Sequence, residues 1–81
     1  MRCRVKLFAR ARDLAGAGEV SVTLPDGATV ADLRRALSDA YPALAGLLER
    51  SALAVDNEFA DDTVQISSGA EVALLPPVSG G

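Results

Sequence analysis

The residues with the clearest chemical potential are the last eleven of the chain, which read EVALLPPVSGG from Glu71 to Gly81. Pro76-Pro77 fixes φ twice and removes two backbone donors, so the chain must leave any sheet that holds the preceding residues. Beyond the prolines, residues 78–81 can span about 13 Å when extended. Gly80 and Gly81 carry no Cβ and can enter a narrow channel. We expect an arm that delivers the terminal carboxylate of Gly81 into another protein's active site.

A terminus rich in Gly and Ser has a second interpretation, because chain ends often fray and carry no function. Here the diglycine follows a strand pattern and the two prolines without a flexible spacer. This context favours the delivered arm over simple fraying. We place one folded domain at residues 1–77 and a flexible diglycine tail at residues 78–81.

The composition argues against catalysis by this chain alone. The chain has no histidine and one cysteine, Cys3, so it lacks the usual zinc ligands and the usual pairs of nucleophile and base. Cys3 alternates with Val5 and Leu7, which is typical of a small residue on the buried face of a strand. We therefore expect no metal site and no permanently bound cofactor.

The charge distribution argues against nucleic acid as a partner. The net charge is −3, the pI is about 4.7 and the chain has two Phe, one Tyr and no Trp, whereas nucleic-acid binders present a basic face and stacking rings. Residues 51–81 hold five acidic residues and no basic one; this half would suit a basic partner or would simply keep the domain soluble. No apolar run approaches the roughly 18 residues of a membrane span, so we expect a cytoplasmic protein without membrane contact.

The pattern along the chain predicts an α+β fold, with a mixed sheet of four to five strands packed on one main helix. Residues 2–9 and 19–24 alternate as half-buried strands do, and a short helical turn joins them. Thr29 and Asp32 resemble a capping box that begins an amphipathic helix, which Pro42 ends. Further segments follow: a short helical stretch at 43–50, and strand patterns at Leu53 and Val55, at Phe59, at Val64–Ile66 and in the final residues.

Phe8 interrupts the first strand's polar face, which otherwise holds Arg2, Arg4 and Lys6. A single exposed aromatic is often incidental, yet near a sheet edge it can belong to a contact patch. The pattern leaves both interpretations open.

Three stretches resemble a known family. They are VKLFARARDLAG at residues 5–16, PDGAT at residues 25–29 and the ending EVALLPPVSGG. These are similar to the small, sulfur-carrying subunits of molybdopterin synthase, which are ubiquitin-like proteins. PPVSGG is the most specific part, since all ubiquitin-like carriers share the diglycine. The resemblance covers nearly the whole chain and implies a β-grasp fold with the first and last strands at its centre.

The resemblance also implies a chemistry for the tail. A terminal carboxylate has a pKa of about 3.5, so at neutral pH it is an anion and a poor electrophile. In the family, an ATP-dependent adenylyltransferase of the ubiquitin-activating type adenylates the terminal glycine, and a sulfur donor converts it to a thiocarboxylate. Carried over, the reacting residue is Gly81, and its sulfur goes to cyclic pyranopterin monophosphate. The general acid–base groups would belong to the large catalytic subunit.

The docking residues implied by the resemblance lie near the tail. The large subunit would contact an apolar patch at Phe8, Phe59 and Leu75, with Arg12 beside it, and Leu75 stands where some relatives have an aromatic residue. Pro76 is implied for the same docking role. Val78, Ser79 and Gly80 are implied as the tail that enters the large subunit ahead of Gly81.

Other functions remain compatible with the sequence. The chain could carry sulfur for another pathway, such as thiamine or cysteine synthesis, or it could modify proteins by forming isopeptide bonds with lysines. Lys6 is its only lysine, so a polymer of this chain would have to be linked there. A plain interaction module with an incidental tail is the remaining alternative.

Overall fold

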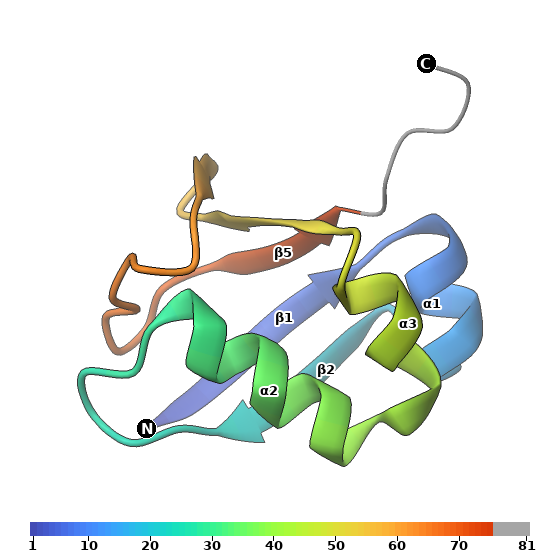
Figure 1. Cartoon of the computed structure of the whole chain (residues 1–81), viewed down its shortest axis with the longest axis horizontal. Coiled ribbons are helices and arrows are strands. Elements are labelled where there is room, and N and C mark those ends of the chain that lie inside the picture. The colour runs from blue at the N-terminus through green and yellow to red at the C-terminus, as the bar shows by residue number, and fades with distance from the viewer. Residues whose placement is uncertain (76–81) are drawn as a thin grey trace.

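The computed structural model describes residues 1–75, which form a five-stranded sheet with helices α2 and α3 on one face and α1 at one end (Figure 1). The elements are β1 (Arg2–Leu7), α1 (Ala9–Ala15), β2 (Glu19–Thr23), α2 (Val30–Ala40), the 3₁₀ helix η1 (Pro42–Leu44), α3 (Ala45–Leu48), β3 (Ala52–Val55), β4 (Glu58–Ala60) and β5 (Val72–Leu75). The predicted α+β class is confirmed. The predicted domain boundary at residue 77 lies outside the described residues.

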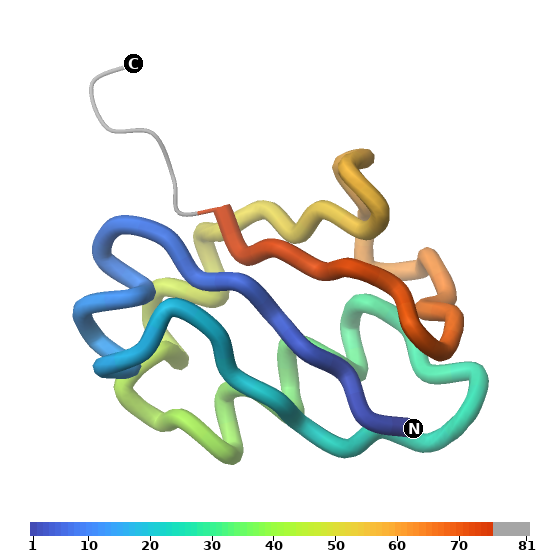
Figure 2. The backbone as a smooth tube through the Cα atoms, turned by 180° about the vertical axis from the view of Figure 1, so that it is seen from behind, coloured from blue at the N-terminus to red at the C-terminus, as the bar shows by residue number. Residues whose placement is uncertain are grey.

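The sheet is mixed and has the order β2-β1-β5-β3-β4. β1 and β5 pair in parallel, with Val5 opposite Val72 and Leu7 opposite Leu74, while the other neighbours are antiparallel. Figure 2 shows the two strands side by side, although most of the chain separates them in sequence. The expectation that the first and last strands are central is therefore confirmed.

The main helix begins at the predicted capping box. The backbone N–H of Thr29 donates to Asp32 Oδ2 at 2.9 Å, and the N–H of Asp32 donates to Thr29 Oγ1 at 3.4 Å. The backbone hydrogen bond from Thr29 holds the pKa of Asp32 below its usual range, and the Thr29 hydroxyl adds to this effect. Two otherwise unpaired donors at the start of α2 are thus satisfied within one turn.

The core lies between the sheet and α2. Strands β1 and β2 alternate buried and exposed positions, as predicted, and α2 buries Val30, Leu33 and Leu37 against them. Cys3 is buried in this layer, and burial raises the pKa of its thiol. The thiolate, which is the nucleophilic form, is therefore disfavoured.

Two predicted segments differ in the structure. The first strand was expected to run to Ala9 but ends at Leu7, because the backbone turns at Ala9 (φ of 50°) and Ala11 becomes the buried residue of α1. Val64–Ile66 is not a strand of the sheet, and its only ladder contact is an isolated bridge between Thr29 and Gln65. Its backbone instead bonds the residues that enter α2, since the Ile66 N–H donates to the carbonyl of Ala28 at 2.8 Å.

The other face of the sheet carries no helix within residues 1–75 (Figure 2). The side chains of Arg2, Arg4 and Lys6 are exposed there, as the alternation of β1 predicts. We call this the outer face. No helix in the described part of the chain is long and apolar enough to cross a membrane.

Arg34 ties three segments together, and its loss should destabilise the fold. Its Nε donates to Asp62 Oδ1 at 2.8 Å, and its Nη1 donates to the carbonyl of Leu48. We expect Arg34→Met to lower the free energy of unfolding by about 1–2 kcal/mol, because the Leu48 carbonyl loses its charged donor while the Asp62 pair is exposed and contributes little. Urea denaturation measures the difference. The exposed neighbour Arg35→Met is the control, and equal losses in the two variants would contradict this role.

Candidate functional site

The structure brings the three predicted apolar docking residues together on the outer face. Phe8, Phe59 and Leu75 line one shallow depression of about 290 Å³, together with Ala54, Asn57 and Ala73. We call the five apolar residues of this depression the apolar patch: Phe8, Ala54, Phe59, Ala73 and Leu75. The structure thus places the three residues side by side, and their role in binding stays a prediction.

Strand register explains how the patch forms. Ala54 on β3 pairs with Phe59 on β4 and with Ala73 on β5, so all three project from the outer face. Phe59 is 78% exposed. The two alanines are too short to fill the space between the larger side chains, so a depression remains beside the Phe59 ring.

A two-residue turn between β3 and β4 sets this register. Asp56 and Asn57 both adopt positive φ, at 51° and 69°, as a type I′ hairpin turn requires. Asp56 also ties the hairpin to the residue before β5: its N–H donates to the Glu71 carbonyl at 2.8 Å, and its Oδ1 accepts from the Glu71 N–H at 3.0 Å. The hairpin that carries Phe59 is thus held against the strand that leads to the tail.

Phe8 reaches the patch because β1 runs parallel to β5. Leu7 lies opposite Leu74, so the next residues, Phe8 and Leu75, lie at the same end of the two strands. Phe8 is 46% exposed, and its carbonyl accepts hydrogen bonds from the first turn of α1. The Phe8 side chain is therefore oriented by a fixed strand-to-helix junction.

The remaining predicted site residues lie elsewhere. Arg12 is exposed on α1, one turn after Phe8, and its side chain does not line the depression. Pro76 and the tail residues Val78, Ser79, Gly80 and Gly81 lie outside the described residues. Leu75, a residue of the apolar patch, is the last residue that the structure describes.

Sequence reasoning missed Ala54, Ala73 and Asn57. The alternation of β3 and β5 could have placed both alanines opposite the buried Leu53 and Leu74, on the outer face. An alanine in a sequence does not by itself indicate a docking site. Here the two alanines contribute only the space that they leave beside the larger side chains.

The patch holds no group that could perform acid–base chemistry. None of the six residues that line it has a side chain that ionises at neutral pH. Within residues 1–75, no three Cys, Asp or Glu side chains lie close enough to hold a metal ion. Within the described residues, the patch is therefore an apolar surface without a titratable group.

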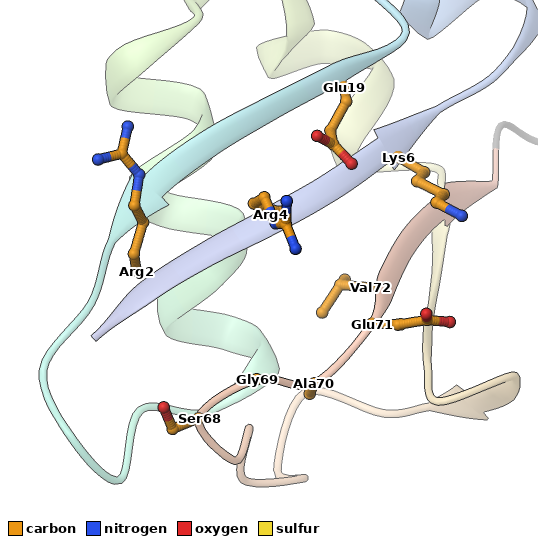
Figure 3. Close-up of a pocket in the computed structure, with 9 residues that line it drawn as sticks. All are labelled: Arg2, Arg4, Lys6, Glu19, Ser68, Gly69, Ala70, Glu71 and Val72. Atoms are coloured by element: carbon orange, nitrogen blue, oxygen red, sulfur yellow. The ribbon is translucent and has the colours of Figure 1, made fainter.

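A larger hollow of about 440 Å³ lies on the same face, and its polar lining comes mainly from charged side chains (Figure 3). Arg2, Arg4 and Lys6 of β1 lie between Glu19 of β2 and Glu71, which precedes β5. A turn formed by Ser68, Gly69 and Ala70 closes one side of the hollow. Sequence reasoning identified the charged face but not this enclosure, which depends on the long-range pairing of β1 with β5.

Comparison with known proteins identifies the family. The sequence profile of the ThiS family matches residues 5–81. The chain belongs to the ThiS family. It is similar to the molybdopterin synthase sulfur carrier subunit of Dictyostelium discoideum, with 38% identity over 81 residues that cover 96% of this chain and 94% of the relative. The resemblance noted in the sequence is therefore confirmed.

Solved structures confirm the ubiquitin-like β-grasp fold. The crystal structure of SAMP1 from Haloferax volcanii superimposes with a TM-score of 0.87 and 34% identity, covering 100% of both chains. A chain in the complex of subunits 1 and 2 of the molybdopterin-converting factor from Helicobacter pylori gives a TM-score of 0.70, with 23% identity and 100% coverage of both chains. This second likeness concerns the fold alone.

The two faces of β3 and β4 should respond differently to truncation. We expect Phe59→Ala to change the free energy of unfolding by no more than about 0.5 kcal/mol, because the ring is exposed. Leu53 is fully buried on the opposite face, so Leu53→Ala should cost about 2–5 kcal/mol. Urea denaturation compares the two. If Phe59→Ala cost as much as Leu53→Ala, the ring would belong to the core and not to a free surface.

Proposed function

We propose that this protein is the sulfur-carrying subunit of a molybdopterin synthase, with sulfur held as a thiocarboxylate on Gly81. The observation that carries the proposal is the apolar patch, which includes Leu75, the last described residue before the C-terminal arm. An exposed cluster of two phenylalanines and a leucine suits a protein partner. Its position lets that partner hold the domain while the arm enters a catalytic centre. The match to molybdopterin synthase sulfur carrier subunits over nearly the whole chain supports the choice of pathway.

The proposed chemistry begins with activation of Gly81. An ATP-dependent adenylyltransferase joins the terminal carboxylate to AMP and releases pyrophosphate. A sulfur donor then forms a carbon–sulfur bond at the same carbon, and AMP leaves with the oxygen that it was bonded to. ATP is thus consumed by the activating enzyme, and this chain needs no permanently bound cofactor.

The second half of the proposed reaction takes place in the large catalytic subunit. There the sulfur of Gly81 passes to cyclic pyranopterin monophosphate, and an oxygen from water replaces it, which regenerates the carboxylate. The large subunit supplies the acid–base groups, since the patch has none. This chain contributes the docking surface and the reach of the arm, which bring the reacting carbon to a fixed position.

A second candidate function is protein modification. It is favoured by the likeness to SAMP1, the small archaeal modifier protein 1 of Haloferax volcanii, which is 37% identical in sequence over 84 residues. In that case the activated Gly81 would form an isopeptide bond with a lysine of another protein. A sulfur carrier for thiamine or cysteine synthesis is a further alternative, because those pathways would use the same thiocarboxylate.

Changes at Gly81 test the tail chemistry. Deleting Gly81, or adding one residue after it, should abolish sulfur transfer in a reconstituted synthase, because the reacting carbon is lost or displaced. Thermal unfolding should not change, because neither variant alters the core. Sulfur transfer by either variant would refute the mechanism.

The intact mass of the chain from its own host separates the alternatives: sulfur in place of one oxygen at Gly81 indicates a carrier, and a lysine linkage indicates a modifier.

Phe8→Ala tests the patch as the docking surface. The variant should bind the large subunit at least tenfold more weakly, because a half-exposed ring that becomes buried in an interface contributes about 1.4 kcal/mol or more. Isothermal titration measures the affinity. Leu14→Ala is the matched control, since Leu14 is 38% exposed on α1 and does not line the patch. Unchanged affinity for Phe8→Ala would remove the patch from the proposal.

A further inference from the structure

The basic side chains of the outer face lack partners within the described structure. Arg2, Arg4 and Lys6 form no ion pair among residues 1–75, where the ion pairs are those of Met1 with Asp26 and of Arg34 with Asp62. All three project from β1 into the hollow of about 440 Å³. In a chain whose net charge is −3, this concentration of free cations on one strand requires an explanation.

The strand register separates Lys6 from the two arginines. Lys6 lies opposite Glu19 on β2, so an acidic residue stands beside it in the sheet. Arg4 lies opposite Ser21, and Arg2 lies opposite Thr23. Their neighbours on β2 are neutral. On the other side of β1, Glu71 lines the same hollow as Arg4 but forms no ion pair with it within residues 1–75, so the two guanidinium groups remain available to an anion. The α carbons of Arg2 and Arg4, two residues apart on one strand, lie roughly 7 Å from each other, which matches the spacing of alternate residues of an extended peptide.

The basic hollow is continuous with the apolar patch. Lys6 lines the hollow and also lines a smaller depression that contains Phe8, Ala54 and Ala73 of the patch. The register gives the same result, because Lys6 pairs with Ala73, and Ala73 pairs with Ala54. Lys6 is two residues from Arg4 on β1. A partner that covers the patch and reaches Lys6 therefore lies close to Arg4.

We propose that the large subunit, which docks on the apolar patch, places an acidic segment along β1, with carboxylates on Arg2 and Arg4. This inference rests on the proposed function and adds the chemistry of the partner's surface. Guanidinium groups bind carboxylates in a planar, two-bonded geometry, so a carboxylate-bearing segment is the occupant that two free arginines favour. The apolar patch supplies contact area, and the arginines fix the direction in which the partner lies across the sheet.

Charge reversal tests the proposal. We expect Arg4→Glu to weaken binding of the full chain to the large subunit about tenfold at 50 mM salt, and the difference should shrink at 500 mM salt as screening increases. Arg35→Glu is the matched control, because it makes the same charge change at an exposed position on α2, which lies on the opposite face of the sheet. Arg2→Glu should repeat the effect of Arg4→Glu. Circular dichroism verifies that each variant folds.

The outcomes separate this inference from the proposed function. Equal effects of Arg4→Glu and Arg35→Glu would show that only net charge matters, and no effect of Arg4→Glu or Arg2→Glu would show that β1 is not contacted. Either result overturns the inference. If Phe8→Ala still weakened binding in those experiments, the proposed docking would stand without it. A wild-type chain that does not bind the large subunit would overturn both.

Cross-linking gives an independent measurement. A carbodiimide joins carboxylates directly to amines, and Lys6 is the only lysine of the chain. In the complex, Lys6 should become linked to an Asp or Glu of the large subunit, identified by peptide mass mapping. The free chain shows the background from its own Glu19 and Glu71. Links in the complex to these two residues alone would contradict an acidic segment on β1.

Discussion

The parallel pairing of β1 with β5 is the constraint on which the rest of the structure depends. It joins the start of the chain to its last described strand, and it places Val5, Leu7, Val72 and Leu74 in one buried layer. Because parallel neighbours end at the same edge, it also puts Phe8 beside Leu75. The core, the apolar patch and the starting point of the arm are therefore consequences of one pairing. A shift of this register by one residue would move buried side chains to the outer face.

Side-chain alternation gives the two faces of the sheet different compositions. The inner face packs against the helices through branched apolar residues, and the outer face carries small alanines, two phenylalanines and a row of charged side chains. This separation lets docking residues vary without cost to the core. It also suits the proposed function, in which the activating enzyme and the large subunit both bind this chain.

Local patterns predicted most elements, and long-range pairings explain where prediction failed. The alternation of β1 and β2, the capping box at Thr29 and the stop at Pro42 are encoded within a few residues, so they were correct. Val64–Ile66 alternates like a strand, but its partner is the loop that enters α2, and alternation does not reveal the partner. Phe8, Phe59 and Leu75 were grouped through the family resemblance, because their proximity depends on the register of four strands. Nothing in the sequence around Ala54 and Ala73 indicated that they line an exposed patch.

The position of β5 has a mechanical consequence. β1 starts at one end of the sheet and β5 ends at the other, so tension applied beyond Leu75 against the body of the domain acts along the strands. The hydrogen bonds between β5 and its two neighbours would then share the load, whereas bonds in a peeled hairpin break one after another. The double hydrogen bond between Asp56 and Glu71 adds a brace at the start of β5. Under the proposed function, an enzyme that binds the residues beyond Leu75 therefore pulls on a strand that is hydrogen-bonded to a neighbour on each side.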